Sequence, residues 1–106
     1  MILLATLVRL LFGDQRCRDA LARTCRDEDI ERLASAVLPF TIEAASTATG
    51  CEREQIERLV EDLRSRHGRV AIFCGTGSTM AIDGVLVEWL RWVLLIMTDS
   101  LDVEGG

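Results

Sequence analysis

The chain has 106 residues, of which 49% are hydrophobic and 27% charged, a composition typical of one folded globular domain. Its 17 acidic and 12 basic side chains give a net charge of −5 at pH 7. Because nucleic acids and anionic membranes are bound by clustered Lys and Arg, this charge excludes both as general partners.

Two apolar stretches stand near the ends of the chain. Residues 2–12 are apolar almost throughout, which predicts a helix buried on most sides. No basic leader or small-residue cleavage site accompanies them, so we interpret this stretch as a core helix and not as a secretory signal. Residues 85–97 are interrupted by Glu88 and Arg91 and fall short of the roughly 20 residues that a membrane-spanning helix needs. We therefore expect no membrane segment and a cytoplasmic protein.

A charged connector follows the opening helix, and three further helices are predicted after it. The first begins with Asp27 as its N-cap, carries apolar residues at i, i+3, i+4 and i+7, and ends before Pro39. Thr41 is the predicted N-cap of a short helix that stops at Gly50. The third, from 52 to about 66, repeats the apolar stripe.

The stretch RVAIFC, residues 69–74, is short, apolar and followed by glycines, as expected of a strand buried on both faces. A helix from about Thr79 into the nineties follows it. No second strand is evident, so the backbone of this strand needs neighbours from outside the chain. The sequence predicts a mainly α fold of about five helices with a single βα unit, one partial domain made of a helical part (1–68), a strand, glycine loop and apolar helix (69–98) and a C-terminal turn (99–106).

The glycine loop after the predicted strand leaves two alternatives open. Gly75 and Gly77 match the first two glycines of a dinucleotide fingerprint, but Met80 stands where the third is expected. A P-loop is excluded because the chain has no Lys. Ser78 and Thr79 can cap the following helix, whose free amides would attract an anion. The loop is thus either a plain turn or an anion or nucleotide site.

No catalytic residue and no metal ligand is predicted. The four cysteines, Cys17, Cys25, Cys51 and Cys74, do not form a CxxC pair. The only histidine, His67, would lie roughly 23 Å from Cys74 along an extended strand, at about 3.3 Å per residue, so the two cannot form a catalytic pair. We interpret the cysteines as buried free thiols in a reducing compartment.

Three stretches in this order resemble an internal region of the molybdopterin-dependent oxidoreductases, the family of formate dehydrogenases and nitrate reductases. They are LPFTIEAASTATGCEREQIERL (38–59), RVAIFCGTGSTMAIDG (69–84) and EWLRWVLLIMTDSLDVEGG (88–106). The family pattern is a "P-[YF]-T-P-E-x-A-A-x-x-T-G" helix, an "E-x-I" helix, a buried strand, a glycine loop, and an apolar helix ending in "T-G-N-[IL]-x-x-P-G-G". The chain departs from it at Ile42, Glu52 and Glu104, where Pro is frequent.

The resemblance implies that the glycine loop lines a molybdopterin guanine dinucleotide cofactor. Met80 and Ala81 stand where nitrate-reductase-like members have a Gln-His pair, so backbone amides are the expected contact. The cofactor-lining positions implied are Thr76, Gly77 and Met80, with Gly75, Ser78 and Thr79 beside them.

The resemblance implies two-electron oxidation or reduction of a small substrate such as formate or nitrate by the whole enzyme. The family's iron–sulfur cysteine motif, metal ligand and most of its cofactor-binding loops are not in this sequence, so we expect the isolated chain to bind no cofactor and to be inactive. The alternatives are a small helical interaction or oligomerisation protein and an anion or nucleotide binder at residues 75–80. Expected partners are a second copy or the rest of a larger enzyme, bound through the strand 69–74 and Trp89, Trp92, Leu94, Leu95, Ile96 and Met97.

Overall fold

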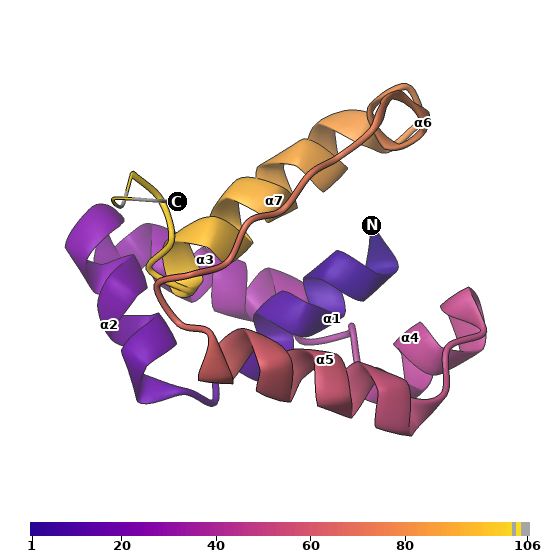
Figure 1. Cartoon of the computed structure of the whole chain (residues 1–106), viewed down its shortest axis with the longest axis horizontal. Helices are drawn as coiled ribbons and strands as arrows, with labels where there is room; N and C mark the ends of the chain where they lie inside the picture. The colour runs from indigo at the N-terminus through magenta and orange to yellow at the C-terminus, as the bar shows by residue number, and fades with distance from the viewer. Residues whose placement is uncertain (103, 105–106) are drawn as a thin grey trace.

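The computed structural model describes residues 1–102 and residue 104. Over these residues the chain is all-helical, with seven helices and no strand (Figure 1). The helices are α1 (Ile2–Leu11), α2 (Gln15–Thr24), α3 (Asp27–Val37), α4 (Ile42–Thr49), α5 (Arg53–Ser65), α6 (Thr76–Thr79) and α7 (Gly84–Met97).

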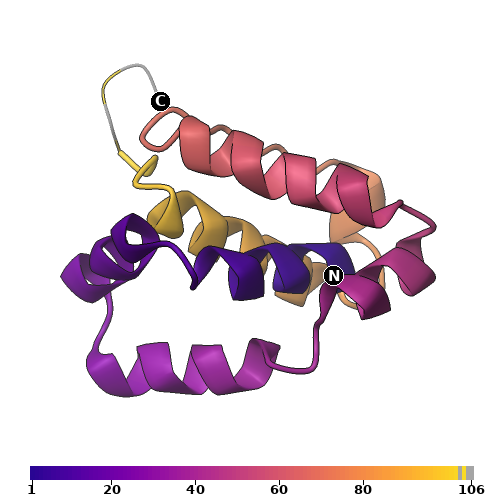
Figure 2. The same ribbon diagram turned by 90° about the horizontal axis from the view of Figure 1, so that it is seen from below.

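Helix α1 lies at the centre of the molecule, as its apolar composition predicts. It contacts α3, α4, α5 and α7, and Figure 2 shows it between α3 on one side and α5 on the other. Val8 and Leu11 are fully buried. The one buried polar side chain of α1, Thr6, donates its hydroxyl hydrogen bond to the carbonyl of Ile2 at 2.9 Å, so its burial leaves no unpaired donor.

The predicted helices of the first two thirds are confirmed, with one addition, but the predicted N-cap Asp27 is wrong, because Asp27 already lies in the first turn of α3 and the N-cap residue is Arg26. Thr41 caps α4 by accepting a hydrogen bond from the Ala44 amide at 3.1 Å, and Gly50 ends it in the left-handed conformation, at φ 75°. The addition is α2, which occupies the stretch expected to be a charged connector. Its N-cap Asp14 accepts from the Arg16 amide at 2.8 Å, and its buried side chains Cys17, Ala20 and Leu21 pack toward the core.

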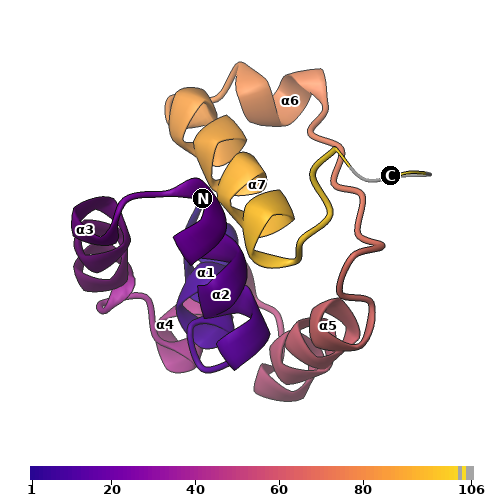
Figure 3. The ribbon, with the colours of Figure 1, turned by 90° about the vertical axis from the view of Figure 1, so that its left-hand side faces the viewer.

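The predicted strand at residues 69–74, and with it the βα unit, is wrong. The segment crosses the molecule from α5 to α6 beside α7 (Figures 1 and 3). Its side chains alternate between exposed at 69, 71 and 73 and half-buried at 70, 72 and 74, which indicates an extended backbone. A strand also requires ladder hydrogen bonds, and in the described part of the chain no second extended segment supplies them.

The apolar segment near the C-terminus is a helix, but it begins later than expected. The predicted helix from Thr79 is divided into the single turn α6 and the longer α7, which starts at Gly84. After α7, the Thr98 hydroxyl donates to the Leu94 carbonyl at 2.9 Å, and the Val70 amide donates to the Ser100 hydroxyl at 2.9 Å. Of the predicted turn over 99–106, residues 103, 105 and 106 lie outside the described residues.

Candidate functional site

The six cofactor-lining positions implied by the resemblance lie together on one exposed turn. Gly75 precedes α6 and is half-buried, whereas residues 76–80 are all exposed. Helix α6 packs against α7 at the end of the molecule (Figure 1). The structure thus brings these positions to one surface, not to an enclosed pocket.

Close backbone packing between α6 and the start of α7 gives this turn its shape. A Cβ atom on Gly84 would lie 2.0 Å from the carbonyl oxygen of Thr79, so only glycine allows the two backbones to approach this closely. The Thr79 hydroxyl donates back to the carbonyls of Gly75 and Thr76 at 3.4 and 3.3 Å. The predicted capping of the following helix by Ser78 and Thr79 is therefore wrong, because the N-cap residue of α7 is Asp83.

The turn offers backbone donors but no positive charge. Among the described residues, the Thr76 and Gly77 amides donate no hydrogen bond, as expected at the start of a helix. Residues 75–82 carry no ionisable side chain, and Asp83 follows them with its carboxylate 3.8 Å from the N-terminal amino group. Two amides without a cation can contact one side of an anionic ligand, but they do not enclose it.

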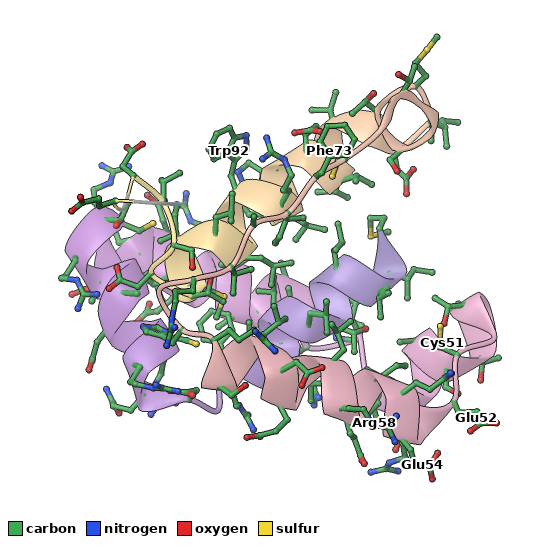
Figure 4. All side chains as sticks on the ribbon, viewed as in Figure 1. Cys51, Glu52, Glu54, Arg58, Phe73 and Trp92 are labelled. Carbon is green, nitrogen blue, oxygen red and sulfur yellow. The ribbon has the colours of Figure 1, made fainter. Side chains whose placement is uncertain are left out.

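Large apolar side chains surround this turn and continue along the outer side of α7. Phe73 is 93% exposed and Ile82 is fully exposed, while Trp89 and Trp92 are each about half exposed. Figure 4 shows Phe73 and Trp92 on the same outer side of α7. We call this region the α7 apolar surface, and its residues are Phe73, Met80, Ile82, Val85, Leu86, Trp89 and Trp92.

Only some of the predicted partner-binding residues belong to this surface. Trp89 and Trp92 do, and Ile96 is half-buried at its margin. Leu94, Leu95 and Met97 are buried, so they are not available to a partner. The sequence alone does not separate these two groups, because α7 is apolar on most of its circumference.

A cleft that sequence reasoning missed lies beside Trp89 and Trp92. It has a volume of about 150 Å³ and is formed by α2, α3 and α7. Arg91 lies next to it, with its guanidinium carbon 4.3 Å from the centre of the Trp92 ring, and donates to Glu88 at 2.9 Å. The lining residues are Leu21, Cys25, Asp29, Ile30, Leu33, Trp89, Trp92, Val93 and Ile96. The spacing of the apolar residues within α2 is the sequence signal that could have indicated a helix on this side of the cleft.

The chain matches no known protein family, no curated protein and no solved structure.

The four cysteines are free thiols. Cys17 is buried, and burial raises the pKa of its thiol to about 11, which keeps it protonated and unreactive at neutral pH. Cys25, Cys51 and Cys74 are half-buried free thiols. Within the described residues no group of three or more His, Cys, Asp or Glu side chains is placed to hold a metal, and no helix is long and apolar enough to cross a membrane.

Proposed function

We propose that this chain forms part of a cytoplasmic molybdopterin-dependent oxidoreductase of the formate dehydrogenase and nitrate reductase type. In this proposal the turn at residues 75–80 lines the cofactor. The observation that carries it is that the glycine-loop residues 76–82 are all exposed and so accessible to a ligand. The four free cysteines agree with a reducing compartment.

The turn fits one side of a phosphate-bearing cofactor. A Cβ atom on Gly77 would meet nothing within 4 Å, so the space beside this residue is open to a ligand. The Thr76 and Gly77 amides supply donors there, and the Met80 side chain, 80% exposed, supplies an apolar contact. In the whole enzyme the cofactor supplies the metal centre for two-electron transfer, while this chain contributes binding surface. Its turn carries no acid, base or nucleophile with a role in proton or group transfer.

The test is to find the natural polypeptide that contains this sequence. Trypsin releases residues 70–91, which include the complete turn, as one peptide because Arg69 and Arg91 bound it. We expect this peptide in native fractions that contain molybdenum, within a polypeptide much larger than 11.8 kDa. Recovery of the peptide only from a polypeptide of about that mass, in fractions free of molybdenum, would contradict the proposal.

The role of the turn is tested in the same enzyme by substitution at Gly77. Gly77→Glu places a negative charge where the cofactor phosphate is expected, so molybdenum and pterin content should fall while the polypeptide persists. Leu59→Glu on α5, a substitution of an exposed residue far from the turn, serves as the control. Equal cofactor content in both variants would rule out a cofactor-lining turn.

A second candidate function is that of a helical interaction protein without a cofactor. The α7 apolar surface favours it, because a contiguous exposed apolar surface is characteristic of protein–protein contact sites. The peptide experiment separates the two, since an independent interaction protein would be found without molybdenum.

A further inference from the structure

The described chain exposes more surface than a compact protein of its mass. Its accessible area is 6707 Å², whereas a monomer of 11.8 kDa has about 5,900 Å² by the usual scaling. The radius of gyration, 13.3 Å, is close to the roughly 13 Å expected for a domain of this length, so an elongated shape does not explain the excess. The excess of roughly 800 Å² equals the area that each partner buries in a protein interface of standard size.

Part of the α7 apolar surface forms a stripe with a symmetric pattern. On α7 the residues of the stripe follow one another at intervals of three, three and four positions, which keeps them on one helix face. The spacing of the central three reads the same in both directions from Trp89. The stripe consists of Leu86, Trp89, Trp92 and Ile96.

We propose that a second copy of this chain covers the stripe, in a two-fold symmetric dimer with the axis at Trp89 and the two α7 helices antiparallel. Two-fold interfaces bring the same patch of both copies together, so the patch must be self-complementary. In this register Leu86 lies opposite the partner's Trp92. Each contact therefore occurs twice, and the two Trp89 rings meet at the centre.

The charges beside the stripe are compatible with this register. Glu88 and Arg91 form an ion pair at 2.9 Å on α7. Because residues one before and two after Trp89 lie outside the stripe on the helix, these two side chains neutralise each other within one chain and bring no unpaired charge to the interface.

The cleft beside the stripe provides a place for one apolar side chain of the second copy. Its volume of about 150 Å³ matches that of an apolar cavity large enough to take up benzene. Trp92 lines the cleft, and the register places the partner's Leu86 above Trp92. Insertion of that side chain would also shield Cys25 in the cleft wall.

The dimer is tested by sedimentation equilibrium of the purified chain. We expect twice the 11.8 kDa monomer mass at about 50 µM, within the affinity range of standard interfaces. Leu86→Glu should raise the dimer Kd by at least about 100-fold, because a tenfold loss at each of two symmetric positions multiplies. Leu59→Glu on α5 is a matched control, since Leu86 and Leu59 are 42% and 38% exposed and both lie in helices.

A second measurement covers the case in which Leu86→Glu does not fold. The rate of Cys25 modification in the wild-type chain should fall at least severalfold between dilute and concentrated protein, because dimerisation covers the cleft. Cys51, which lies across the molecule from Trp92 in Figure 4, should react at a constant rate. A monomeric wild type at this concentration, equal Kd values for Leu86→Glu and Leu59→Glu, or a constant Cys25 rate would each overturn the dimer.

The dimer proposal can be wrong while the proposed function is right, and the reverse, because different experiments test them. The dimer rests on the area and pattern of the exposed stripe, whereas the proposed function rests on the family motifs and the turn. Sedimentation uses the purified chain alone, and the peptide experiment uses the natural source.

Discussion

The region from α1 to α5 and the region from residue 69 to α7 differ in how well their helix ends are capped and their apolar side chains are covered. In the first region α2, α4 and α5 each begin with a side-chain cap, and α1 is covered by its neighbours. In the second, α7 buries Leu90, Val93 and Leu94 on its inner side but exposes large apolar residues on its outer side, and its N-cap Asp83 makes no capping bond. Apolar composition alone therefore does not distinguish buried core residues from exposed ones.

The largest expected difference in the free energy of unfolding is between variants of an inner and an outer side chain of α7. Leu94→Ala should lower the free energy of unfolding by about 3 kcal/mol, because Leu94 is 1% exposed and its loss leaves a cavity. Val85→Ala on the same helix should change it by less than about 0.5 kcal/mol, since Val85 is 89% exposed. Urea unfolding at submicromolar protein isolates the monomer. Similar losses for both variants would mean that the outer side of α7 is packed within one chain.

The second prediction concerns alkaline pH and the buried thiol of the first region. Burial raises the pKa of Cys17 from 9.0 to about 11, so the folded state favours the protonated form. Its contribution to stability is complete below pH 9 and is lost as the pH rises to 11, a decrease of about 2–3 kcal/mol. Few other groups interfere, because the chain contains no Lys and no Tyr.

The measurement is urea unfolding between pH 8.5 and 11 under reducing conditions. Cys17→Ala should remove most of the slope, whereas Cys74→Ala, in the second region, should leave it unchanged. A slope that persists without Cys17 would show that another group causes the alkaline loss.

Local signals were sufficient to predict most of the first region. The apolar residues 2–12, the N-cap Thr41 and the stop at Gly50 each act within one or two helical turns, and the structure confirms them. Helix α2 was missed because its many charged residues obscure a short apolar stripe, Cys17, Ala20 and Leu21, on a helix that contacts α7.

The errors in the second region have a common physical cause. Residues 69–74 have the composition of a strand, but strand formation depends on backbone partners and not on composition. The same holds for α7, where Leu94 and Leu95 look like Val85 and Leu86 in the sequence but are buried by α1 and α2. The loop positions 75–80 are adjacent in the sequence and lie on one turn, whereas the cleft at Cys25 depends on three helices.

The third prediction compares the N-caps of the two regions. Asp14→Ala should destabilise the chain by about 1–2 kcal/mol, since Asp14 caps α2 and lies 3.4 Å from Arg16 and 3.9 Å from Arg64. Asp83→Ala should cost less than about 0.5 kcal/mol, because Asp83 makes only a 3.8 Å ion pair with the N-terminus. Thermal unfolding of both variants at pH 7 makes the comparison.

Lowering the pH should reduce the difference in stability between Asp14→Ala and Asp83→Ala. Burial opposes ionisation of Asp14, but the hydrogen bonds and charge of Arg16 outweigh it and hold the pKa of this carboxyl below its usual value. Its contribution is therefore present above the unfolded pKa, near 4, and is lost as the pH falls through the lower folded value. An Asp14→Ala effect that is the same at pH 7 and pH 2 would exclude ionised Asp14 as the cause.

The smallest expected effects on stability distinguish Gly50, whose backbone conformation requires glycine, from Gly77, which leaves room for a ligand. Gly50→Ala should cost about 1 kcal/mol, because at φ 75° an L side chain is strained. Gly77→Ala should cost nothing, since its backbone is not left-handed and a Cβ atom would meet nothing within 4 Å. Denaturant unfolding of the two variants decides this. If Gly77→Ala is neutral here while Gly77→Glu removes cofactor from the natural enzyme, the glycine serves ligand approach and not folding. A loss equal to that of Gly50→Ala would instead make Gly77 part of the turn's own stability.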